Sequence, residues 1–194
     1  MSATLFSEAD ALQAWCLTQD WRFCFIGGLA VQHWGRPRVT DDIDVTLLTG
    51  FGGEERFAEA LLRRYAARVE EPMAFALRNR VMLLKTADGF GIDIAFGGLA
   101  FEEAAVNRAT MVSLIPGTEL NLCSAEDLVV MKSFAGRPID WMDVESVIVR
   151  QQGKLDWGYI YSQLEPLAAL KESPELVTQL RVLEKRSRSG RLRM

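Results

Sequence analysis

The stretch that decides the fold runs from Gly27 to Asp44 and reads GGLAVQHWGRPRVTDDID. Its Gly-Gly pair follows the apolar run FCFI at 23–26, which is the pattern of a buried strand that stops at a tight turn. A short helix is expected next, over LAVQHW. The stretch runs into DIDVTLL at 42–48, where polar and apolar residues alternate and β-branched residues recur, so a second strand is predicted there.

Two carboxylates lie side by side on that predicted strand. Side chains at positions i and i+2 point to the same face, so Asp42 and Asp44 project together while Ile43 and Val45 face the core. Neighbouring carboxylates repel each other, and a divalent cation between them relieves the repulsion. Asp93, in GIDIAF, adds a third carboxylate if its strand pairs beside the first. Three carboxylates can hold two metal ions of the kind that promote in-line displacement at phosphorus.

The Gly27-Gly28 pair indicates phosphate binding. Glycines between a strand and a helix let backbone N–H groups approach a phosphate, and the helix N-terminus adds favourable polarity. Arg38 and Thr40, just before the carboxylates, are expected to contact a triphosphate by charge and by hydroxyl hydrogen bonding. Each of these features is common alone, but their order and spacing together are much more specific.

The composition limits the choice of metal. His33 is the single histidine, which excludes a His-rich metal site. Carboxylate ligands favour a hard cation, so we expect Mg²⁺ or Mn²⁺. The three cysteines, Cys16, Cys24 and Cys123, are widely spaced and suit buried thiols in a reducing cytoplasm. The N-terminus lacks a basic segment followed by an apolar stretch, and no apolar run approaches the ~18 residues of a membrane span, so a cytoplasmic protein is expected.

The pattern of these residues resembles that of the DNA polymerase β-type nucleotidyltransferase superfamily. That pattern is a hydrophobic residue, Gly-Gly or Gly-Ser, and then Asp-x-Asp. Here the pattern reads Ile26-Gly27-Gly28 and Asp42-Ile43-Asp44. In more detail the chain is similar to the AbiEii-like branch, the toxin half of bacterial abortive-infection toxin–antitoxin pairs.

Further positions match that branch over roughly residues 24–145. The branch has a Lys before its third Asp, an Asp-x4-Lys helix and a later Asp. The matching residues are Lys85 and Asp93, then Asp127 and Lys132, and finally Asp143 or Asp140.

The resemblance implies a role for each matched residue. The catalytic residues would be Asp42, Asp44, Asp93 and Lys132, with the three aspartates as metal ligands. The NTP would be bound by Gly27, Gly28, Arg38, Thr40, Lys85 and Asp127. Structural interpretations stay open beside these: Asp127 is placed to cap a helix that starts after Ser124, and Lys132 lies on an apolar helix where a lysine is often only the wet edge.

The predicted fold class is α/β (α+β). We expect a small mixed β-sheet nucleotidyltransferase core flanked by helices over residues 1–123. A helical C-terminal region over 124–194 is expected to pack on it and to end in a basic tail at 185–194. The formal net charge is −4, and the basic tail could touch RNA or be only a solvated terminus.

The predicted function is metal-dependent transfer of a nucleoside monophosphate from an NTP to an acceptor hydroxyl, with release of pyrophosphate. Transfer to tRNA or another RNA fits the resemblance, while a protein or a small molecule as acceptor fits the chemistry equally well. The alternative is a non-catalytic nucleotide-binding component of a toxin–antitoxin pair, and either interpretation allows an antitoxin protein as partner. The NTP is left open because base selectivity depends on the shape of the pocket.

Overall fold

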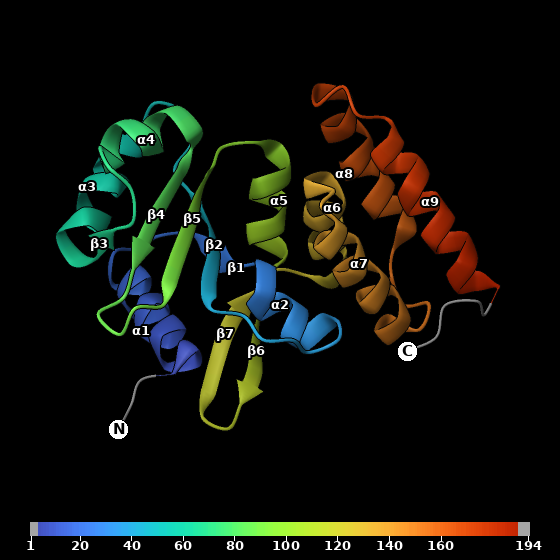
Figure 1. The fold of residues 1–194 in the computed structure, drawn as a ribbon, viewed down its shortest axis with the longest axis horizontal. Coiled ribbons are helices and arrows are strands. Elements are labelled where there is room, and N and C mark those ends of the chain that lie inside the picture. The colour runs from blue at the N-terminus through green and yellow to red at the C-terminus, as the bar shows by residue number, and fades with distance from the viewer. Residues whose placement is uncertain (1–3, 190–194) are drawn as a thin grey trace. The chain divides into compact units, whose positions relative to one another are not determined.

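The computed structural model describes residues 4–189, which form two compact units (Figure 1). The sheet unit comprises the chain up to Leu29 together with Val39–Cys123. The helical unit comprises Ala30–Arg38 and the chain from Ser124 onward. The chain therefore leaves the sheet unit at Ala30 and returns to it at Val39, and we call Ala30–Arg38 the crossing segment.

The sheet unit is built on a mixed sheet with the strand order β3-β4-β5-β2-β1-β7-β6. Strand β2 is parallel to β5 and β1 is parallel to β7, whereas the other neighbours are antiparallel. The strands are β1 (Phe23–Phe25), β2 (Asp42–Leu48), β3 (Ala66–Ala67), β4 (Val81–Lys85), β5 (Gly91–Gly97), β6 (Thr110–Ile115) and β7 (Thr118–Leu122). The helices wholly within this unit are α1 (Leu5–Thr18), α3 (Glu54–Arg64), α4 (Pro72–Asn79) and α5 (Ala100–Arg108).

Along β2 and β5 apolar residues alternate with other residues. The core therefore lies on one face of these strands and the candidate site on the other. On each strand every second residue is apolar and at most 1% exposed, so one face of this part of the sheet is buried in the core. The intervening residues turn to the opposite face, and these include the three aspartates. The buried residues are Ile43, Val45, Leu47, Ile92, Ile94 and Phe96.

The helical unit contains the end of α2 (Gly27–Trp34) and four further helices: α6 (Ala125–Ala135), α7 (Pro138–Gln151), α8 (Trp157–Leu170) and α9 (Glu175–Arg188). Helix α6 begins at a cap, because the Ser124 hydroxyl accepts a hydrogen bond from the N–H of Asp127 at 3.1 Å. Each helix contributes fully buried apolar side chains to the core of the unit, among them Leu128, Val144, Ile160 and Leu180.

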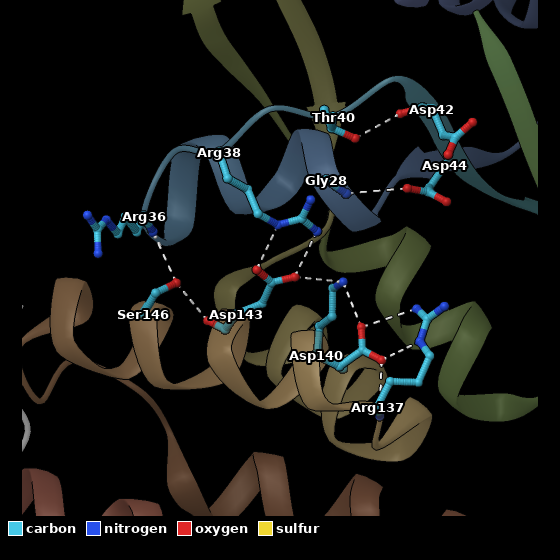
Figure 2. Close-up of polar contacts among 11 residues, drawn as sticks. Gly28, Arg36, Arg38, Thr40, Asp42, Asp44, Arg137, Asp140, Asp143 and Ser146 are labelled. Atoms are coloured by element: carbon cyan, nitrogen blue, oxygen red, sulfur yellow. Dashed lines mark hydrogen bonds and ion pairs between the residues drawn. The ribbon is translucent and has the colours of Figure 1, made fainter.

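Hydrogen bonds join the crossing segment to α7 within the helical unit (Figure 2). The N–H of Arg36 donates to the Ser146 hydroxyl at 3.0 Å, and the Arg150 guanidinium donates to the Gly35 carbonyl at 2.7 Å. A Cβ on Gly35 would lie 2.5 Å from Oγ of Ser146, so a side chain at this position would displace the Ser146 hydroxyl that the N–H of Arg36 binds. The crossing segment is therefore an integral part of this unit.

The fold class predicted from the sequence is confirmed, with local differences. Helix α3 ends at Arg64, because Tyr65 adopts an extended backbone that leads into β3. Helix α4 was not expected at all. Helix α2 begins at Gly27 itself, so the glycine pair is its first turn.

The basic tail predicted from residue 185 starts as ordinary helix. Lys185, Arg186 and Arg188 lie in the last turn of α9, while Arg191 and Arg193 fall outside the described residues. Over the part of the chain that the structure describes, no helix has the length and the apolar character needed to cross a membrane.

Candidate functional site

The centre of the candidate site is a pair of aspartates on adjacent parallel strands. Asp44 on β2 lies opposite Asp93 on β5 in the strand register, and Asp42 lies opposite Gly91. Because residues in register on neighbouring strands present their side chains to the same face, Asp42, Asp44 and Asp93 share one face of the sheet. The sequence alone predicted the β2 pair, and the parallel pairing adds the third carboxylate.

Arg68, which the sequence analysis did not single out, reaches this cluster. It follows β3, and its N–H donates to the Leu83 carbonyl at 3.0 Å. Leu83 pairs with Asp93, which in turn pairs with Asp44, so these four residues form a row across the sheet. The Arg68 guanidinium forms an ion pair with Asp93, and its Nη1 lies 3.8 Å from Oδ1 of Asp42.

Gly91 makes room for this arrangement. A Cβ at residue 91 would lie 1.9 Å from Oδ1 of Asp42 and 3.3 Å from Cζ of Arg68. Burial raises the pKa of Asp93 above its usual value; Arg68 opposes that rise, while the negative charge of Asp42 adds to it. Arg68 thus favours the ionised form of Asp93.

The glycine pair packs directly against the carboxylate of Asp44 (Figure 2). Gly27 has φ +57°, and a Cβ there would lie 2.0 Å from Oδ2 of Asp44. The N–H of Gly28 donates to the same oxygen at 3.3 Å. A Cβ on Gly28 would lie 2.3 Å from Oγ1 of Thr40, whose hydroxyl donates to the Asp42 carbonyl at 3.4 Å. Close approach thus favours glycine at both positions, and the positive φ favours it at Gly27 as well.

The donors of this cluster fit a hard divalent cation, because all three side chains offer carboxylate oxygens. Within residues 4–189 no three potential ligands are already arranged around a single ion position. Arg68 lies against two of the three carboxylates, those of Asp42 and Asp93.

Lys85 lies on the same face of the sheet as the three aspartates, because it pairs with Gly91, which in turn pairs with Asp42. It ends β4 in register with Gly91, but it is exposed and lines a separate cavity of about 410 Å³ together with Glu8, Arg64 and Tyr65. Its predicted role in NTP binding stays a prediction.

Lys132 and Arg38 belong to a second charged cluster, which lies within the helical unit (Figure 2). Lys132 Nζ lies 2.9 Å from carboxylate oxygens of both Asp140 and Asp143. Arg38 donates two hydrogen bonds of 3.0 Å to the Asp143 carboxylate, and Arg137 donates to Asp140. Asp140 is fully buried and Lys132 is 8% exposed.

The cations of this second cluster hold its carboxylates ionised. Burial alone would raise the pKa of Asp143, but hydrogen bonds and charge from Arg38 and Lys132 outweigh it, so its pKa lies below the usual value. The pKa of Asp140 is lowered in the same way, against burial, by Arg137 and Lys132. Lys132 and Arg38 therefore have structural partners, and their predicted catalytic and NTP-binding roles stay predictions.

Asp127 is buried at the start of α6. The Ser124 hydroxyl donates to one of its carboxylate oxygens at 2.5 Å, and the Tyr159 hydroxyl donates to the other at 2.5 Å. These contacts give Asp127 the structural role that its position predicts, and its role in NTP binding stays a prediction.

A larger cavity, of about 760 Å³, opens at the other end of β2 and β5. Its lining includes Leu48 and Gly97, where the two strands finish, with Arg22, Arg56 and Trp21 around them. The three aspartates do not line it. The candidate site is thus formed by the carboxylates and the glycine pair and not by this cavity.

No family model matches the chain, and no curated protein matches it in sequence. Among solved structures, the antibiotic-resistance factor ANT(2'')-Ia in solution is 20% identical, with a TM-score of 0.53 over 93% of this chain and 98% of that one. The lincosamide adenylyltransferase LnuA with lincomycin bound is 15% identical, with a TM-score of 0.52 over 76% and 98%.

A nucleotidyltransferase-like protein from Paracoccidioides brasiliensis is also similar, at 16% identity and a TM-score of 0.50 over 91% of this chain and 92% of that one. At these sequence identities the structural similarity shows the fold alone. The chain has the nucleotidyltransferase fold.

Proposed function

We propose that this chain, which has the nucleotidyltransferase fold, is a metal-dependent nucleotidyltransferase. It transfers a nucleoside monophosphate from an NTP to an acceptor hydroxyl and releases pyrophosphate. The observation that carries the proposal is the position of Asp44, which lies against Gly27 and Gly28 on one side and in register with Asp93 on the other. Phosphate-binding backbone and carboxylate ligands are thereby joined in a single cluster.

The residues of the sheet unit divide the chemistry among them. The backbone at Gly27 and Gly28 is placed to receive a phosphate. Asp42, Asp44 and Asp93 would hold Mg²⁺ or Mn²⁺, which supplies charge to the transferred phosphoryl group and to the leaving pyrophosphate. Asp93 accepts the proton of the acceptor hydroxyl as the new O–P bond forms at the α-phosphorus and the bond to the β-phosphate oxygen breaks.

We further propose a small hydroxyl-bearing molecule as one class of acceptor. Two structures that share the fold are described as an antibiotic-resistance factor and as a lincosamide adenylyltransferase with lincomycin bound. The AbiEii-like resemblance supports the other class, tRNA or another RNA, together with a toxin role and an antitoxin partner. The experiment below distinguishes a small-molecule acceptor from an RNA acceptor.

The test is pyrophosphate release in Mg²⁺ from each NTP, with three acceptor sets: total cellular RNA, a panel of hydroxyl-bearing antibiotics, and no acceptor. Asp44→Asn is compared with Asp41→Asn, because Asp41 is an exposed neighbour of the same charge. We expect release with at least one NTP and one acceptor set, a loss of about a hundredfold or more in Asp44→Asn, and no comparable loss in Asp41→Asn.

Label from [α-³²P]NTP would then be found in the RNA or in the small molecule, which identifies the acceptor class. Binding of NTP and Mg²⁺ by isothermal titration without pyrophosphate release in any set would favour the alternative, a non-catalytic nucleotide-binding protein. Equal activity of Asp44→Asn and the wild type would contradict the proposal itself.

A further inference from the structure

Arg68 contacts two of the three carboxylates that are proposed as metal ligands. Its guanidinium contacts both Asp42 and Asp93, which lie on different strands of the sheet. The side chain reaches them along the row that runs from residue 68 over Leu83 to Asp93. It is only 33% exposed, so the contact is partly shielded from water.

The glycine at residue 91 indicates that this contact is built into the strand. Any side chain there would collide with Asp42 and crowd the Arg68 guanidinium. The absence of a Cβ thus opens the space in which the arginine and the carboxylate meet.

A guanidinium and a divalent ion compete for the same carboxylate oxygens. Without a cation, Asp42 and Asp93 would repel each other across adjacent strands. Arg68 relieves that repulsion with one positive charge on a side chain that can move, whereas a divalent ion supplies two charges in a compact volume.

We infer that Arg68 is a positioning residue that holds Asp42 and Asp93 together until the metal and the NTP arrive. When the metal site is filled, the Arg68 guanidinium would leave these oxygens for the triphosphate, since a planar guanidinium pairs well with phosphate oxygens. Arg68 thereby weakens metal binding to the free protein and strengthens NTP binding to the metal-loaded protein. The inference rests on the proposed function.

The experiment measures metal binding apart from activity. Free Mn²⁺ is followed by electron paramagnetic resonance in titrations of the wild type, Arg68→Gln and Arg63→Gln, all without nucleotide. Arg63→Gln is the matched control. This substitution removes the same charge from an exposed position on α3, where Arg63 pairs with Glu59. We expect Arg68→Gln to bind Mn²⁺ about tenfold more tightly than the wild type, and Arg63→Gln to bind it as the wild type does.

A second titration measures the affinity for a non-hydrolysable NTP analogue at saturating Mn²⁺. We expect Arg68→Gln to bind it about tenfold more weakly than the wild type. Arg68→Lys keeps the charge without the planar fork, so its Mn²⁺ affinity is expected to stay near that of the wild type. Thermal unfolding curves would check that each variant is folded. If Arg68→Gln does not fold, the affinities of Arg68→Lys for Mn²⁺ and for the analogue are compared with those of the wild type instead.

The outcomes separate this inference from the proposed function. If the wild type releases pyrophosphate but Arg68→Gln binds Mn²⁺ no more tightly than it does, the inference is overturned and the function stands. If Mn²⁺ binding tightens while the affinity for the analogue is unchanged, the transfer of Arg68 to phosphate is overturned. If the wild type neither binds Mn²⁺ nor releases pyrophosphate, both proposals fail.

Discussion

Asp44 and Asp93 are direct partners in the register of two parallel strands, although 49 residues separate them in the sequence. Parallel pairing requires a long connection, and here the chain from α3 to β4 supplies it. The site thus depends on the topology of the sheet as much as on any local motif, which makes the contacts around these two residues the natural place to test it.

We expect Gly27→Ala to lose most of the transferase activity while the protein still folds. An added Cβ would lie 2.0 Å from the Asp44 carboxylate, so the carboxylate must move. Strain at φ +57° adds a cost in stability of about 1 kcal/mol. Pyrophosphate release and thermal unfolding, measured on the same preparation, test both parts.

Gly117→Ala is the matched control for that variant. Gly117 has φ +82°, but a Cβ there would meet nothing within 4 Å. The free energy of unfolding of Gly117→Ala should fall by a similar amount, and its transferase activity should be unchanged. An active Gly27→Ala enzyme would show that the contact with Asp44 is unimportant.

We expect Lys132→Met to destabilise the protein by about 3–5 kcal/mol, because it leaves the buried carboxylates of Asp140 and Asp143 without their shared cation. Urea unfolding measures the loss. Lys154→Met, at an exposed position, should change the free energy of unfolding by less than about 0.5 kcal/mol. A stable Lys132→Met protein without activity would instead support the catalytic role predicted for this lysine.

The free energy of unfolding should decrease in acid, because the carboxylates of Asp140 and Asp143 become protonated there. The pKa values of Asp140 and Asp143 are below the usual 3.8 in the folded protein, so their contribution is complete above about pH 4 and is lost as the pH falls through the folded values. Thermal unfolding between pH 5 and pH 2 should show a shallower dependence in Asp143→Asn than in the wild type. Asp10→Asn, at an exposed site, should follow the wild type.

The three cysteines should resist thiol reagents in the native protein. Cys16, Cys24 and Cys123 form no disulfide bond in the described part of the chain, and each is at most 2% exposed. Burial raises the pKa of the Cys16 thiol to about 12, so very little thiolate forms near neutral pH. Reaction with a chromogenic disulfide should be slow without denaturant and complete in guanidinium chloride. Rapid reaction of one thiol in the native state would contradict the burial seen here.

Local patterns were enough to predict most of the elements of this fold. Alternation predicted the strand at 42–48 with the bounds that β2 has. The apolar run at 23–26 that ends in Gly27-Gly28 likewise predicted β1. The serine before α6 predicted the cap that starts it. Each of these signals acts over a few neighbouring residues, which is why one sequence reveals them.

The features that the sequence did not reveal depend on tertiary contacts. Arg68 lies in RVEEP after a helix, where a single arginine has no distinguishing pattern, and only the sheet brings it to Asp93. The partners of Lys132 and Arg38 were likewise hidden, because Asp143 is 105 residues from Arg38 in the chain. The sequence therefore predicted candidate residues better than it predicted what each of them contacts.

The crossing segment also constrains how the chain can be made and divided. Ala30–Arg38 leaves the ribosome well before α7, whose Ser146 and Arg150 bind it. We expect the helical unit to remain incomplete during translation until α7 has been synthesised, although part of it has been present from early on. A fragment cut at Cys123 would carry this segment without its partners, so the two units cannot be inherited or exchanged as separate modules by a single cut.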